Sequence, residues 1–250
     1  METRTKRMRT AVRVAVVVVA GCCAAAAAAQ DWTANLYLQG SYPKQTRTNE
    51  QIAEINSAFG TRFEDWGDVV NLSVGGQLLR RVARHWKVGL EADYSQGELS
   101  GRAQVPTEAG PARLEFRQRY SSFADLFAAA HFLPCPDCRR VEPFVLLAAG
   151  VGYEKDYTTL RLHNDFVDER LRVDNDGTFP VYTAGIGADV PLTARRNLFL
   201  QFGTAYFWGR FQQHVPARGS LAPAPEVLAD TDSTGPNVWI GLSWRLGGSR

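Results

Sequence analysis

The feature that most constrains this chain is an alternation of apolar and polar residues, repeated in eight segments after residue 30. In one of them, Trp86, Val88 and Leu90 alternate with Lys87 and Gly89. A period of two places successive side chains on opposite faces of a β-strand, so each segment predicts a strand with two different environments. Most segments approach the roughly 9–11 residues that a tilted membrane strand needs. The pattern predicts an all-β fold: an eight-stranded antiparallel up-and-down barrel.

A soluble sandwich or lipocalin-like barrel would alternate in the same way, with its apolar face inward. Here one face carries large apolar groups, while the other mixes charges with Gly and Ala, which suits a narrow barrel interior. Aromatic residues recur near the segment ends on the apolar face, where the two membrane interfaces would lie. They are Trp32, Tyr42, Trp86, Tyr94, Tyr120, Tyr153, Tyr182, Trp208 and Trp244. These features favour a transmembrane β-barrel.

The connections between the segments alternate in length. Short ones lie around 81–85, 134–140 and 191–196, and long polar ones at 43–68, 97–112, 156–178 and 211–236. Short periplasmic turns and long extracellular loops are typical of an even-stranded outer-membrane barrel with both termini in the periplasm. We therefore expect the four long connections to be extracellular loops.

The N-terminus predicts an export signal over residues 1–29. Basic residues precede a short Val- and Ala-rich run, and small residues follow it. Cleavage after Ala29 would leave one barrel domain, 30–250. The run Val19-Ala20-Gly21-Cys22 also resembles the bacterial lipobox, in which the cysteine is lipidated, so a cut before Cys22 is the alternative.

Net charge and motifs exclude some classes of function. The chain has a formal charge of +2, which is too small to indicate a nucleic-acid-binding surface. No spacing matches a cofactor motif or an EF-hand. We expect no cofactor and no metal site.

Several motifs suggest a family. Val141-Glu142-Pro143-Phe144-Val145, running into Ala149-Gly150-Val151-Gly152-Tyr153, resembles the "PYxxxGxGY" strand of small OmpA-type outer-membrane β-barrels. The last strand is similar to the C-terminal signal read by the barrel-assembly machinery, through Gly241, Trp244 and Leu246, although a Gly247–Arg250 tail follows it. The resemblance implies the bacterial outer membrane, with its lipids and lipopolysaccharide as surroundings, and a monomer. It implies little about activity.

Cys135-Pro136-Asp137-Cys138 lies in a short turn predicted to face the periplasm. That compartment is oxidising, so a structural disulfide is expected. A redox pair would need a helix N-terminus to lower a thiol pKa, and zinc would need about four ligands. Idle thiols and a redox function are the alternatives.

The four histidines give no catalytic arrangement. A hydrolytic barrel enzyme would need a serine beside a histidine that activates it, but His163 and His214 lie in predicted loops and His85 in a turn. His131 is predicted to point inward at the periplasmic end. We expect no catalytic residues and no enzyme.

The predicted inward face is rich in charge. We expect its members to pair with one another, because unpaired buried charges are costly. An eight-stranded interior has room for little beyond side chains, so the pairs would plug the lumen, with a charge-lined conduit as the alternative. The residues of this predicted lumen network are Lys87, Glu91, Asp93, Glu115, Arg117, Arg119, Asp125, Glu154, Asp189 and Arg245.

Two local features complete the pattern. The short turns are basic, which suits contact with anionic lipid headgroups. The run Thr48-Asn49-Glu50-Gln51 forms a capping-box pattern, and Ile52, Ile55 and Phe59 follow at helical spacing up to Gly60. We expect a short helix over 49–59 that caps the barrel mouth.

The sequence thus predicts a non-enzymatic outer-membrane barrel with a structural or surface-interaction role. One alternative is a porin-like channel for small or hydrophobic solutes. A lipid A-modifying enzyme is a second alternative, which no motif supports.

Overall fold

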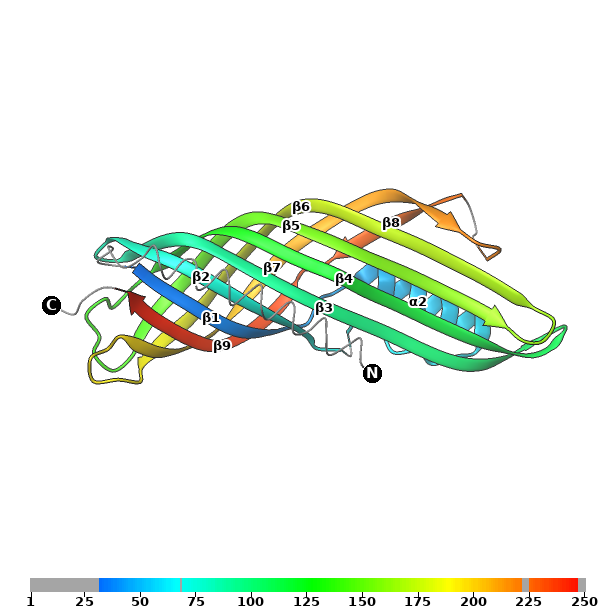
Figure 1. The fold of residues 1–250 in the computed structure, drawn as a ribbon, viewed down its shortest axis with the longest axis horizontal. Coiled ribbons are helices and arrows are strands. Elements are labelled where there is room, and N and C mark those ends of the chain that lie inside the picture. The colour runs from blue at the N-terminus through cyan, green and yellow to red at the C-terminus, as the bar shows by residue number, and fades with distance from the viewer. Residues whose placement is uncertain (1–31, 68, 222–224, 247–250) are drawn as a thin grey trace.

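Eight antiparallel strands close into a ring in the computed structural model, which describes residues 32–67, 69–221 and 225–246, with only the backbone at 47 and 120–123 (Figure 1). The predicted export signal and Cys22 lie outside the described residues. The strands of the ring are β1 (Trp32–Ser41), β2 (Asn71–Ala83), β3 (Trp86–Thr107), β4 (Gly110–Phe132), β5 (Glu142–His163), β6 (Asp168–Pro191), β7 (Leu198–Arg218) and β9 (Gly235–Leu246).

The first and last strands close the barrel. β1 pairs with β2 on one side and with β9 on the other, and Trp32 lies opposite Leu246 at the end of the seam. Every strand pairs antiparallel with its neighbours around the ring, including β6 with β7 and β7 with β9. The predicted eight-stranded up-and-down barrel is confirmed.

A ninth strand, β8 (Glu226–Asp232), extends the line of β9. β8 pairs with Arg210–Pro216 of β7, and β9 pairs with Leu198–Phe207 of the same strand. The two pieces are therefore one long strand that is interrupted at Ser233 and Thr234.

The half of the barrel near the termini exposes apolar side chains on its outer face. Leu72, Leu38 and Ile186 are more than 60 % exposed, although each lies within a paired strand. Aromatic side chains lie near the two ends of this outward face, with Trp86 at one end and Tyr42, Tyr153, Tyr182 and Trp208 at the other. This outer apolar belt with aromatic borders matches the lipid-facing surface of a transmembrane barrel.

Three of the four connections expected to be loops are strands instead. β3 and β4 run on to a tight turn between Thr107 and Gly110, β5 and β6 run on to His163 and Asp168, and β7 pairs with β8. These hairpins extend the barrel wall well beyond the ends of β1 and β9, as Figure 1 shows. We call residues 97–119, 157–174 and 210–232, together with the helix described next, the projection.

The helix α2 (Thr46–Phe59) lies against the inner face of the projection (Figure 1). The helix was expected over 49–59 and does end at Gly60, but it starts earlier, after Gln45, and has no side-chain cap. Asn49 instead accepts a hydrogen bond from the Trp66 N–H (3.0 Å). Within the described part of the chain, no helix has the length and apolar character that a membrane crossing requires.

The polarity of the wall reverses between the belt and the projection. In the belt, apolar groups face outward; in the projection, they face inward and form a core with α2, while charged residues alternate on the outside. The core contains Ile52, Phe63, Trp66, Leu99, Val105, Ala112, Leu114, Phe116, Leu160 and Leu162. An apolar interior with a polar exterior is the arrangement of a β-structure in water. The projection is therefore built for solution and the belt for lipid.

A β-bulge contributes to this reversal in β4. The register shifts against both neighbouring strands between Tyr120 and Phe123, where β4 has one residue more than β3 and β5. One extra residue moves every later side chain to the opposite face. As a result, even-numbered residues point inward in the β4 part of the projection, whereas odd-numbered residues such as Asp125 point inward in its membrane part.

Candidate functional site

An ion-pair cluster closes the lumen at the periplasmic end. The carboxylate of Glu142 is buried and accepts hydrogen bonds from Arg196 (2.6 Å) and Arg245. Beside them, Lys87 Nζ lies 3.7 Å from Asp189, and both side chains are almost fully buried. Charge-assisted bonds of this kind are the strongest hydrogen bonds available to a buried carboxylate.

An aromatic layer fills the lumen above that cluster. Phe127, Phe144 and Trp239 are buried together with Tyr37, and Phe144 stacks on the ring of His131 at 4.2 Å. The rings of Phe127, Phe144 and Trp239 were not expected inside the barrel. Glycines give the signal that could have revealed them, because a Cβ at Gly203 would lie 2.3 Å from Trp239 and one at Gly187 2.4 Å from Phe144.

A polar, acidic layer lies above the rings. Tyr37 Oη lies 2.8 Å from Glu91 and 2.8 Å from Asp93, and Gln77 donates to Glu91 at 2.7 Å. Cavities of about 10 and 40 Å³ lie in this layer, and Asp93 lines both. At their size they hold one or a few water molecules.

Two arginines of the predicted lumen network lie elsewhere. Arg117 and Arg119 point to the outer face of the projection, where both lie near Glu98, at 2.9 and 3.9 Å. Glu115 is also outside and pairs with Arg102. Their inward placement was wrong because the bulge between Tyr120 and Ser122 inverts the alternation beyond it.

The lumen is consequently more acidic than expected. Lys87, Asp189, Arg245, Glu91, Asp93, Asp125 and Glu154 do face it. Expected pairing fails for two of them in the described residues: Oδ1 of Asp125 and both carboxylate oxygens of Glu154 accept no hydrogen bond there. Asp156 and Thr231 are the near polar neighbours of Glu154.

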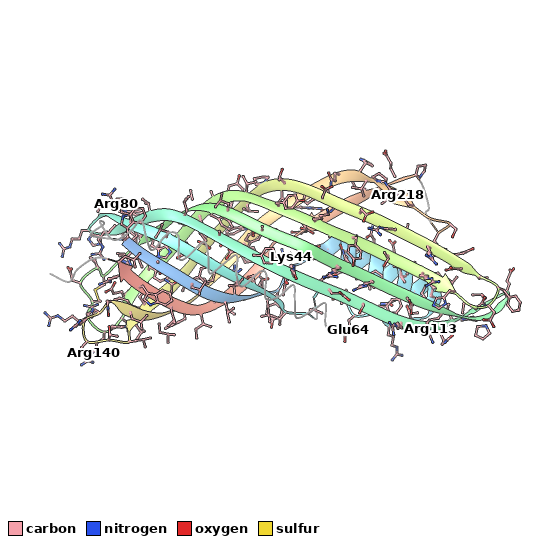
Figure 2. All side chains as sticks on the ribbon, viewed as in Figure 1. Lys44, Glu64, Arg80, Arg113, Arg140 and Arg218 are labelled. Carbon is pink, nitrogen blue, oxygen red and sulfur yellow. A yellow bond between two sulfur atoms is a disulfide. The ribbon has the colours of Figure 1, made fainter. Side chains whose placement is uncertain are left out.

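The turn that follows β4 holds the disulfide predicted from the sequence, Cys135–Cys138. Its neighbour Asp137 pairs with Arg84 at 2.6 Å, and this hydrogen bond lowers the pKa of Asp137. Arg80 and Arg140 lie at this end of the molecule, and Arg113 and Arg218 lie in the projection (Figure 2). The basic turns thus gather on one side of the apolar belt.

Two histidines lie far apart in the barrel wall, His85 in the turn before β3 and His163 at the end of β5. Ring nitrogen Nδ1 of His85 lies 2.7 Å from the Leu133 carbonyl, and His163 lies 4.0 Å from Glu115 on the outer face. No group of three or more His, Cys, Asp or Glu side chains described by the structure could hold a metal ion.

The residues of the expected insertion signal lie on β9. Gly241 faces inward under Tyr37, where a Cβ would lie 2.6 Å from the Tyr37 Cβ. Trp244 and Leu246 lie on the opposite face, next to Ala34 and Trp32 of β1. Gly241 therefore has a packing role in addition to any role in recognition.

Comparisons with known proteins find resemblance only at the level of shape. No protein-family model matches the chain, and no curated protein matches it. Among solved structures, it resembles the outer membrane protein OprG from Pseudomonas aeruginosa (14 % identity, 88 % of this chain and 97 % of that one, TM-score 0.46). It also resembles a major outer membrane protein from Thermus thermophilus (9 %, 86 % and 98 %, 0.44) and the outer membrane protease OmpT from Escherichia coli (9 %, 86 % and 96 %, 0.40).

At such identities and scores, these likenesses assign no activity. The apolar belt, its aromatic borders and the closed ring of strands independently make this chain an outer-membrane β-barrel, because closed barrels leave no strand edge unpaired in lipid.

Proposed function

We propose that this protein is a non-enzymatic surface-interaction barrel, in which a plugged membrane part carries a folded extracellular β-structure that contacts a partner at the cell surface. The observation that carries this proposal is the reversal of polarity along continuous strands. A chain selected only to cross the membrane needs short turns, whereas this one builds a second apolar core beyond the belt, around Trp66 and Leu114.

The lumen supports the same proposal. Its periplasmic end is filled by the Glu142 cluster, and its middle by Tyr37, Phe127, Phe144 and Trp239. The cavities above have room for a few waters. We therefore favour the plug over the channel that the sequence left open, and membership of the OmpA-type family is part of the same proposal.

Ion pairs cover the outer face of the projection. Arg161 and Arg170 both bind Asp168, Arg172 binds Asp174, and Arg210 binds Asp230. Exposed pairs add little stability. Together they make a strongly polar surface of mixed sign, suited to a partner that is itself polar.

The test compares the intact protein with a truncated variant that lacks the projection. In the variant, short turns replace residues 98–118, 157–174 and 210–232, and a flexible linker replaces 46–66. Heat-dependent gel mobility checks that the truncated barrel still folds. Cells that display either form are scored for aggregation and for adhesion to host-cell and matrix-coated surfaces, and the refolded proteins are recorded in planar bilayers.

We expect adhesion or aggregation to depend on the projection and the intact barrel to show no stable open conductance. Equal adhesion by both forms, combined with a stable conductance of the intact barrel, would instead support the channel.

A further inference from the structure

The three short turns at the periplasmic end are joined to one another. Arg84, in the turn between β2 and β3, pairs with Asp137 of the next turn at 2.6 Å. The Cys135–Cys138 disulfide closes that second turn. Arg196, in the turn between β6 and β7, donates a 2.9 Å hydrogen bond to the Cys138 carbonyl. The three turns thus form one connected rim.

Four exposed arginines of this rim have no acidic partner. The acidic side chains of the turns and of the adjoining strand ends already pair with other cations; they are Asp137, Glu142 and Asp189. Within the described residues, no carboxylate lies within ion-pair distance of the four arginines, which are Arg80, Arg139, Arg140 and Arg195. Figure 2 shows Arg80 and Arg140 at this end of the molecule. The rim therefore carries positive charge that the described protein does not neutralise.

Each of the three turns also exposes one aliphatic side chain. Val82, Val141 and Leu192 are 57, 40 and 52 % exposed. Val141 directly follows Arg140 in the sequence. Aliphatic and basic groups side by side are typical of segments that lie in a membrane interface, where the apolar groups enter the lipid and the cations meet the headgroups. We call the four arginines and these three aliphatic residues the turn surface.

The position of Arg80 shows which layer of the membrane this surface meets. Its neighbour Leu79 is buried in the lumen, so Arg80 points outward. It lies there between Trp32 of β1 and Val88 of β3, at the border of the apolar belt. A long basic side chain at such a border keeps its stem in the apolar layer and its charge at the headgroups. Arg80 is therefore placed for a lipid headgroup and not for a soluble protein.

We propose that the turn surface binds anionic phospholipids of the leaflet that faces the periplasm. Its arginines contact the headgroup phosphates, and its aliphatic side chains enter the edge of the acyl layer. Guanidinium groups bind phosphate through paired hydrogen bonds, and basic side chains near a membrane attract anionic lipids. A zwitterionic lipid gains less, because it brings a cation of its own to the surface. The connections between the turns hold the arginines together before the lipid binds.

The test is native mass spectrometry of the refolded barrel in detergent. The protein is mixed with equal amounts of phosphatidylglycerol and phosphatidylcholine of the same chain length, and the lipids that stay bound are counted. We expect the parent to retain phosphatidylglycerol in preference by about fivefold or more, the factor for one arginine that contacts an anionic lipid.

Variants show whether the turn surface causes this preference. Glutamine at Arg80, Arg139, Arg140 and Arg195 should bring the ratio of the two lipids close to one, whereas lysine at the same positions should keep most of the preference. The matched control places glutamine at four exposed arginines of the projection, namely Arg102, Arg113, Arg170 and Arg218, and should behave like the parent. Heat-dependent gel mobility checks that every variant folds.

Equal retention of both lipids by the parent would overturn the proposal, and so would a preference that survives in the glutamine variant of the turn surface. Glycerol 3-phosphate in excess should leave the bound phosphatidylglycerol in place, because it has no acyl chains. Full displacement would mean that the arginines recognise phosphate from solution. Displacement by polyglutamate would instead assign the surface to an acidic protein. Either displacement would contradict a lipid-binding role.

Discussion

Arg196 reaches into the periplasmic end of the barrel and donates a 2.6 Å hydrogen bond to the buried carboxylate of Glu142. Arg245, from the last strand, binds the other oxygen of the same carboxylate. One acidic side chain on β5 thereby joins the turn before β7 to the strand that closes the ring.

Glu142→Gln should destabilise the barrel. The substitution leaves two arginines, each about one-third exposed, without their charged partner. We expect a loss of about 1–3 kcal/mol in the free energy of unfolding, measured by urea titration in liposomes. The control is Asp137→Asn, which removes an exposed pair with Arg84 and should cause no measurable change. Equal effects of the two variants would contradict the closing role of Glu142.

Gly75→Ala should be destabilising through overpacking. The new methyl group would lie 2.4 Å from the Tyr37 ring and 1.8 Å from Asp93. We expect a loss of about 1–3 kcal/mol in the same urea titration. Gly76→Ala, one residue along on the outer face, needs only a slight shift from the Asn35 carbonyl at 3.1 Å and should cost much less. If the two substitutions cost the same, the tight packing of Tyr37 over Gly75 is not what matters.

Trp66→Ala should loosen the projection and leave the membrane barrel folded. Trp66 is fully buried and donates a 2.7 Å hydrogen bond to Gln118. Removing such a side chain typically costs about 3–5 kcal/mol. Limited proteolysis should cut the variant within the projection, while heat-dependent gel mobility stays unchanged. Phe166→Ala, at a site 83 % exposed, serves as the control and should be cut no faster than the parent.

The projection should hold its outermost ion pairs in acid. Hydrogen bonds from Arg161, and then from Arg170, lower the pKa of Asp168 well below its usual value. For a depressed pKa, the stabilisation is complete above the unfolded value of about 3.9 and is lost only as pH falls through the folded value. Carboxyl ¹³C NMR should therefore show Asp168 still ionised near pH 3.

Arg161→Gln removes the first of the two donors and should raise the titration midpoint of Asp168. A midpoint that does not move would mean that the pair with Arg161 does not form in solution.

The strands, the ring closure, the helix end at Gly60 and the disulfide could be predicted, because each depends on local pattern or spacing. The projection was missed because its alternation has the opposite sense, with Leu114 and Phe116 inward and Arg113 and Arg117 outward. If outward-facing residues are expected to be apolar, as in a membrane strand, a segment with charged outward residues is interpreted as a loop. The signal was nevertheless present in the sequence.

The lumen was harder to predict. A bulge changes inward to outward without any clear mark in the sequence, which is why Arg117 was placed inside. The acidic layer depends on which residues meet across the ring, such as Asp93 and Asp125 or Tyr37 and Glu91. The alternation predicts whether a side chain points inward or outward. It does not predict the register between strands, and so it does not show which inward residues lie at the same level along the barrel axis.

The continuity of the strands from lipid into water has a consequence for how such proteins diversify. A hairpin above the membrane can grow or shrink by residue pairs and leave the barrel below untouched, because each added pair preserves the alternation. An odd insertion must be absorbed by a bulge, and β4 contains one at the level where the belt ends. This strand thus has the form that a single-residue change in length would leave behind, which gives evolution a way to remodel the outer surface in small steps.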